Sequence, residues 1–204
     1  ITGGDPSLRF RRVLKYLRLL KKNFGSSHHV HMYCCGELSA AQLHALKTSG
    51  LDEIRFHTWS TRPIELALEA GLTAGVEIPV IPGSYKKIVH LLSELDKTGC
   101  KFVNLNELEF SDTNLEELRA RGFKLKSRDS MAAKGSEAEA IKLLSWAARH
   151  TRLNIHYCPS SLKDAVQLRN RLKRKAKNVA RPHEAITRDG LLVKGIIQGI
   201  SKKE

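Results

Sequence analysis

The sequence is poor in cysteine and has no long apolar run. Four cysteines occur among 204 residues and no CxxC pair is present, so a disulfide framework is not indicated and a reducing cytoplasm fits better. No apolar stretch approaches the roughly 20 residues that a membrane helix needs. The first residues lack the basic region and apolar core of a signal peptide. We therefore expect a cytoplasmic protein without a membrane partner.

Acidic residues are scarce relative to basic ones. Lysine and arginine number 35 against 21 aspartates and glutamates, giving a net charge of +14. Such a surplus favours an anionic partner. The segment Lys163–Lys177 has seven basic residues and one acidic, which is +6 of the total. A solvated helix face explains this run, and contact with RNA or another polyanion is the alternative; no RNA-recognition motif or zinc finger accompanies it.

The chain repeats one theme, in which a short β-rich apolar run is followed by a segment of helical periodicity. The runs that read as strands are His29–Tyr33, Glu53–His57, Ala74–Ile81, Phe102–Leu105 and Leu153–Tyr157. The segments that read as helices are Leu8–Lys22, Ser39–Ser49, Pro63–Ala70, Tyr85–Lys97, Asn114–Arg121 and Glu137–His150. Alternating units of this kind imply a parallel sheet.

Shorter features complete the expected fold. Ile1-Thr2 and Phe123–Lys126 read as further short strands, for a total of about seven, and Ser136 reads as a helix N-cap. No dinucleotide GxGxxG is present, so a doubly wound sheet is less favoured. We predict the α/β class and a partial (β/α) barrel of mostly parallel strands over residues 1–178. Residues 179–204 read as a C-terminal extension, with Leu191–Ile197 as a last strand or a small hairpin.

Ligands of parallel β/α folds bind at the C-terminal ends of the strands. The first such segment, Gly3-Gly4-Asp5-Pro6, resembles the GGEP segment of radical SAM enzymes. The resemblance implies that Gly3, Gly4 and Asp5 hold the methionyl ammonium of S-adenosylmethionine. Two glycines let the backbone approach the ligand, and a carboxylate accepts from a cation.

Later segments extend this resemblance over roughly Ile1 to Ser160. Val76–Gly83 is similar to the fifth strand of relatives of pyruvate formate-lyase activating enzyme, above all archaeal ones, and this strand packs beside the adenine in the family. Arg55 suits the methionyl carboxylate. The cofactor-binding residues that the resemblance implies are Gly3, Gly4, Asp5, Pro6, Arg55, His57, Glu77, Pro79, Asn104 and Asn106.

The cysteine motif of the family, CxxxCxxC, is missing from the sequence. The adjacent Cys34 and Cys35 lack the spacing that places three thiolates on one cubane. As given, the chain is expected to be inactive, with the ligands of a 4Fe–4S cluster in a segment upstream of it. The full-length protein is then expected to generate a 5′-deoxyadenosyl radical on a substrate that the sequence does not disclose.

A metal-dependent barrel hydrolase is the main alternative. His29 and His31 share one face of their strand, because strand side chains alternate, and His57 and His156 end other strands. Such a set could bind zinc and activate water. Cys158 comes at the end of the predicted strand Leu153–Tyr157, as a substrate contact, a second-cluster ligand or a small buried group.

Overall fold

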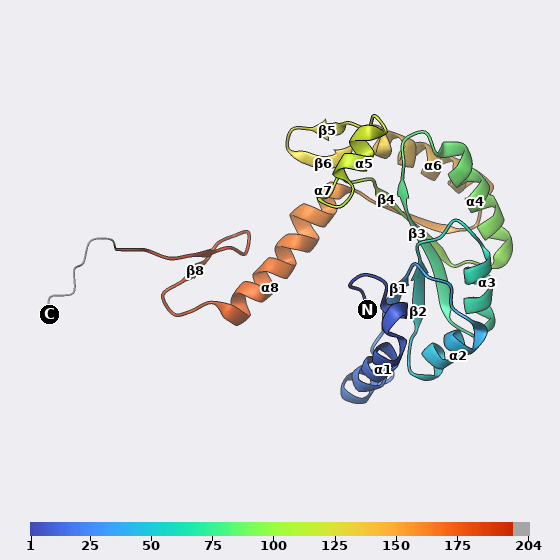
Figure 1. Cartoon of the computed structure of the whole chain (residues 1–204), viewed down its shortest axis with the longest axis horizontal. Helices are drawn as coiled ribbons and strands as arrows, with labels where there is room; N and C mark the ends of the chain where they lie inside the picture. The colour runs from blue at the N-terminus through green and yellow to red at the C-terminus, as the bar shows by residue number, and fades with distance from the viewer. Residues whose placement is uncertain (198–204) are drawn as a thin grey trace. The chain divides into compact units, whose positions relative to one another are not determined.

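A computed structural model describes residues 1–197 of the chain (Figure 1). The chain divides into two compact units, Ile1–Cys158 and Pro159–Glu204. This division lies before the basic segment, whereas the sequence suggested a boundary at residue 178. The two units are described separately.

The first unit is built on a five-stranded, wholly parallel sheet in the order β1-β2-β3-β4-β7. The strands are β1 (His31–Cys34), β2 (Glu53–Phe56), β3 (Thr73–Val80), β4 (Phe102–Glu107) and β7 (Asn154–Cys158). At the outer edge of β1, the Ile1 amine donates to the His31 carbonyl, and the Tyr33 amide donates to the Ile1 carbonyl over 3.1 Å. This is the pairing of a parallel neighbour. The predicted α/β class with parallel strands is confirmed.

Helices precede the first strand of this sheet and connect the later ones. They are η1 (Pro6–Arg9), α1 (Phe10–Phe24), α2 (Ala40–Thr48), α3 (Arg62–Glu69), α4 (Tyr85–Thr98), α5 (Leu115–Ala120) and α6 (Ser136–His150). Helix α2 begins with a capping box, in which Ser39 and Gln42 bond each other's backbone. Helix α4 ends at Gly99, whose φ of 82° is left-handed. All six predicted helices are present.

One face of the sheet carries the hydrophobic core. Strand residues in this core alternate with half-buried ones, and they pack with helix residues in a single cluster. The strand contributors include Met32, Cys34, Ile54, Phe56, Val76, Ile78, Val80, Val103 and Leu105, and the helix contributors include Leu17, Leu43, Leu46, Ile64, Ile88, Leu92, Leu95 and Leu143. Figure 1 shows α2, α3 and α4 along one side of the strands. The other face of the sheet therefore carries the alternate, mostly polar side chains.

Two predicted local features are corrected. Phe123–Lys126 does not join the parallel sheet: β5 (Leu125–Ser127) pairs antiparallel with β6 (Ser130–Ala133). Ser136 is not the N-cap of α6, because Gly135, with a φ of 96°, holds that position. The fully buried Ser136 hydroxyl instead donates to the Val80 carbonyl (2.7 Å) and accepts from the Leu108 amide (2.9 Å). It thereby ties the ends of β3 and β4 to the start of α6.

The second unit contains a helical stretch and a small hairpin. Its elements are α7 (Ser160–Leu162), the π-helix η2 (Lys163–Leu168), α8 (Arg169–Val179), β8 (Ala185–Ile186) and β9 (Leu192–Val193). Strands β8 and β9 pair antiparallel, so the hairpin alternative for the end of the chain holds. None of the described helices is both long and apolar enough to cross a membrane.

Candidate functional site

The polar face of the sheet brings together side chains from four neighbouring strands. In a parallel sheet, residues paired in register point to the same face. Tyr33 is paired with Arg55, Glu77 with Asn104 and Pro79 with Asn106. Their sequence neighbours point into the hydrophobic core. Because strand side chains alternate, the paired residues themselves lie together on the opposite face of the sheet.

Glu77 lies at the centre of this face. Its carboxylate accepts hydrogen bonds from the side-chain amides of Asn104 and Asn106, each over 3.0 Å. The guanidinium of Arg55 lies 3.8 Å away. Three of the predicted site residues, Arg55 on β2 and Asn104 and Asn106 on β4, are thus partners of Glu77 on β3, and together the four form one network of donors and acceptors.

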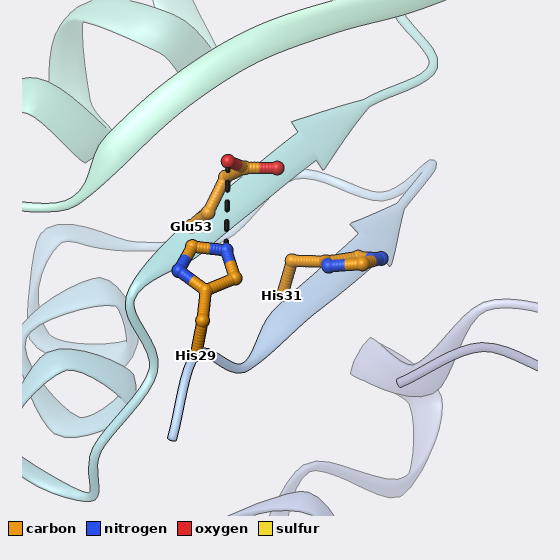
Figure 2. Close-up of side chains that lie close together, drawn as sticks. All are labelled: His29, His31 and Glu53. Atoms are coloured by element: carbon orange, nitrogen blue, oxygen red, sulfur yellow. Dashed lines mark ion pairs between the residues drawn. The ribbon is translucent and has the colours of Figure 1, made fainter. Parts of the chain in front are cut away.

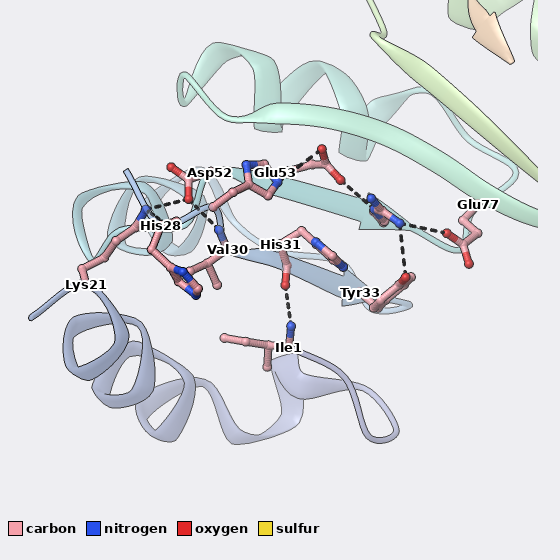
Figure 3. Close-up of polar contacts among 11 residues, drawn as sticks. Ile1, Lys21, His28, Val30, His31, Tyr33, Asp52, Glu53 and Glu77 are labelled. Atoms are coloured by element: carbon pink, nitrogen blue, oxygen red, sulfur yellow. Dashed lines mark hydrogen bonds and ion pairs between the residues drawn. The ribbon is translucent and has the colours of Figure 1, made fainter. Parts of the chain in front are cut away.

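Arg55 extends the network across β2 to β1. Its Nε donates to Glu53 over 2.6 Å, and Nη1 donates to the Tyr33 hydroxyl over 3.2 Å, contacts that Figure 3 shows together with Glu77. The guanidinium also lies 5.6 Å from the Tyr33 ring centroid and 5.5 Å from that of Phe102, within cation–π range. Burial acts to lower the pKa of Arg55, but the hydrogen bond and charge of Glu53 outweigh it and raise the pKa.

The Phe102 ring has its place because residue 75 is glycine. A Cβ on Gly75 would lie 2.4–2.6 Å from three ring carbons of Phe102. Tyr33, Glu53 and Phe102 were not among the predicted site residues. The signal for them is the strand register, which a single sequence does not reveal.

Asp5 anchors the glycine turn to the loop after β1. One carboxylate oxygen accepts from the Ser7 amide (2.9 Å) and the other accepts from the amides of Cys35 (3.0 Å) and Gly36 (2.7 Å). Burial acts to raise the pKa of Asp5, but these hydrogen bonds outweigh it and hold the pKa below its usual value. Asp5 is also the N-cap of η1, so it has a structural role of its own.

The neighbours of Asp5 differ in accessibility. Gly3 and Gly4 have φ values of 113° and 76°, and nothing lies within 4 Å of a Cβ built on either. Their backbone is therefore open to a ligand, whereas Pro6 is buried. His57 follows β2 and donates its amide to the Cys34 carbonyl over 2.9 Å. The cofactor role implied for these residues stays a prediction.

The cysteines do not fit an iron–sulfur cluster. Burial raises the pKa values of Cys34 and Cys100 to about 11, so both are thiols packed in the core. Cys35 is exposed, and Cys158 lies on β7 in register with Asn106. Within residues 1–197, no three of these thiols come together as a ligand group.

The predicted four-histidine site does not form. His29 and His31 cluster with Glu53, each with a ligand atom within 4.8 Å of the others (Figure 2). In the described part of the chain, His57 and His156 do not belong to this group. The reason is their position: His29 and His31 lie at the start of β1, while His57 follows the end of β2.

Trp59 and the basic segment are described separately. Trp59 is 37% exposed and its ring lies 4.0 Å from the ammonium of Lys87, so it packs in its loop against a charged partner. The basic segment Lys163–Lys177 lies in the second unit, over η2 and α8. Its contact with RNA or another polyanion stays a prediction.

Comparison with known proteins gives one informative similarity. No family model matches the chain. A protein of Methanocaldococcus jannaschii, described as a putative glycyl-radical enzyme activating enzyme, is 42% identical over 212 aligned positions, which cover 97% of this chain and 56% of that protein. The chain thus spans about half the length of the curated relative it matches. Over nearly all of its own length, this chain is similar to a protein described as an activating enzyme of glycyl-radical enzymes.

Proposed function

We propose that this chain forms the S-adenosylmethionine-binding part of a radical SAM enzyme that activates a glycyl-radical enzyme. The observation that carries the proposal is the network of Arg55, Glu77, Asn104 and Asn106 on one face of a parallel β/α sheet. These residues match the segments through which the chain resembles the family. The 42% identity to the described activating enzyme supports the same family.

The chemistry of the face suits a zwitterionic cosubstrate with an aromatic base. Arg55 is a donor for the methionyl carboxylate, and the amides of Asn104 and Asn106 can each donate and accept at an adenine edge. Asp5 has about four lone-pair sites, of which backbone amides take three. One site is left for the methionyl ammonium, beside the open backbone of Gly3 and Gly4.

The iron–sulfur cluster of such an enzyme does not fit the residues described here, since their thiols do not group. In the proposal, its ligands belong to a part of the protein outside this sequence. Bound together, the cluster and S-adenosylmethionine would supply the 5′-deoxyadenosyl radical. The contribution of the present chain is to bind and orient the cosubstrate on its polar face.

The substrate in this proposal is another protein. This rests on the description of the similar M. jannaschii protein as an activating enzyme of glycyl-radical enzymes. The hydrogen to be abstracted then belongs to a backbone glycine of that partner.

The test is the binding of S-adenosylmethionine to the full-length protein by calorimetric titration. Asn104→Ala and Glu77→Gln should each weaken binding about tenfold or more, because each removes a polar contact and disturbs its partners. The matched control is Asn23→Ala, since the Asn23 side chain bonds only locally to the Leu19 carbonyl on the surface of α1. Unchanged affinity in both folded variants of the face would contradict the proposal.

A further inference from the structure

The starts of β1 and β2 place three metal-ligating side chains together. His29 and His31 are two residues apart in extended chain, so both rings leave the same side of the backbone. The register pairs His31 with Glu53. Two imidazoles and a carboxylate therefore converge at the strand ends opposite the loop that Asp5 holds (Figure 2).

The distances allow the three donors to close on one ion. The ligand atoms lie within 4.8 Å of one another, and His29 Nε2 is 3.6 Å from Glu53 Oε2. Ligands about 2.1 Å from a tetrahedral ion are roughly 3.4 Å apart. The side chain of His29 is 56% exposed, so this ring has room to rotate toward an ion.

The backbone on both sides of His29 is held in place. Lys21 donates to the His28 carbonyl (2.7 Å) and to Asp52 (2.7 Å), and Asp52 accepts from the Val30 amide (2.7 Å). Figure 3 shows these contacts beside His31. Because the backbone of His29 is already fixed, only its side chain loses freedom when an ion binds, which favours affinity.

Glu53 is oriented by a partner that leaves one oxygen available. Its Oε1 accepts from Arg55, while Oε2 faces His29. This is the arrangement of a metal-ligating carboxylate held by an outer hydrogen bond. Arg55 itself lies between two carboxylates, Glu53 and Glu77, which together offset its positive charge. Within the described residues, the ring nitrogens of His31 make no hydrogen bond that would compete.

We propose that His29, His31 and Glu53 bind a divalent transition-metal ion, with zinc as the best match to two imidazole nitrogens and one carboxylate oxygen. The ion joins β1 to β2 at their N-terminal ends and keeps a position open to solvent. The site is distinct from the proposed cosubstrate pocket, and Arg55 links the two through its contacts with Glu53 and Glu77.

The test is a titration of the untagged full-length protein with Zn²⁺ alone, read by calorimetry and by the shift in melting temperature. One ion per protein should bind at this site, and His29→Ala and His31→Ala should each lower the affinity about tenfold or more. His28→Ala is the matched control, because His28 is the adjacent exposed histidine and lies outside the cluster; it should change the affinity less than about twofold. Cys35→Ser should also retain binding, which separates this site from an exposed thiol.

Two outcomes would overturn the proposal. One is that His28→Ala lowers the affinity as much as His29→Ala, which would mean a loose surface association with any histidine. The other is that the His29→Ala protein binds Zn²⁺ like the unaltered one. His29 is exposed and its substitution leaves the core intact, so this variant gives a result even if His31→Ala does not fold.

Discussion

Gly75→Ala is expected to destabilise the first unit through one contact. Gly75 is not in the left-handed region of φ, so the substitution tests space alone. The added Cβ would lie 2.4 Å, 2.5 Å and 2.6 Å from Cε2, Cζ and Cδ2 of Phe102. Ordinary contacts of a Cβ are 3.4–4 Å, so the ring must move by about 1 Å.

The size of the effect follows from what limits that movement. Overpacking by one methyl group costs about 1–3 kcal/mol. Phe102 is only half-buried, which lets the ring yield, but Arg55 stacks on it and is held by Glu53 in turn. We expect a loss of about 2 kcal/mol. For a chain of this size, that corresponds to a fall in melting temperature of about 4–8 °C.

The assay is thermal unfolding of four proteins: unaltered, Gly75→Ala, Phe102→Ala and the double variant. In the absence of the Phe102 ring, the Gly75→Ala step should stabilise the strand by about 0.5–1 kcal/mol, because alanine is less flexible than glycine in an extended chain. The two substitutions should therefore be coupled by about 2 kcal/mol or more. A Gly75→Ala penalty that persists in the Phe102→Ala background would refute the reasoning.

Two further substitutions test the anchors of the fold. Asp5→Asn should cost about 1–2 kcal/mol of folding stability at pH 7, because an amide cannot accept from all three backbone donors. The folded-state pKa of Asp5 is lowered. The stabilisation by its carboxylate is therefore present above the unfolded-state pKa of about 3.9, and it is lost as pH falls through the folded-state pKa. Melting curves at pH 7 and pH 3 should show the gap to the unaltered protein narrowing, and a constant gap would contradict the assignment. Ser136→Ala should lower the free energy of unfolding in urea by about 1–3 kcal/mol, since it removes the hydroxyl that pairs with the Val80 carbonyl and the Leu108 amide in the core. A loss below about 0.5 kcal/mol would contradict a stabilising role for these two hydrogen bonds.

Strand and helix positions were predictable because they depend on local patterns. The run Glu53–His57 differs from β2 by a single residue, since alternation of buried and half-buried residues is visible in the sequence. The partner of Phe123–Lys126 was not predictable, because strand pairing is a nonlocal choice. The role of Ser136 was missed for a related reason: its partners are 28 and 56 residues away.

In the candidate site, too, some residues could be predicted from the sequence and others could not. Arg55 and Glu77 were identified from segments that resemble a family, and the structure places them 3.8 Å apart. Glu53 was not identified, because its place beside the two histidines depends on the strand register, which sets it opposite His31. The four-histidine hypothesis was wrong because His57 follows the far end of β2 and His156 lies on β7, at the opposite edge of the sheet from β1.

The hydroxyl of Ser136 has a consequence for the kinetics of folding. Its two bonds join segments that are distant in the chain, so both require the closure of long loops before they can form. We expect them to form after the folding transition state. Their loss in Ser136→Ala should then appear as faster unfolding with a nearly unchanged folding rate. A single oxygen atom would thus act mainly on the lifetime of the folded sheet.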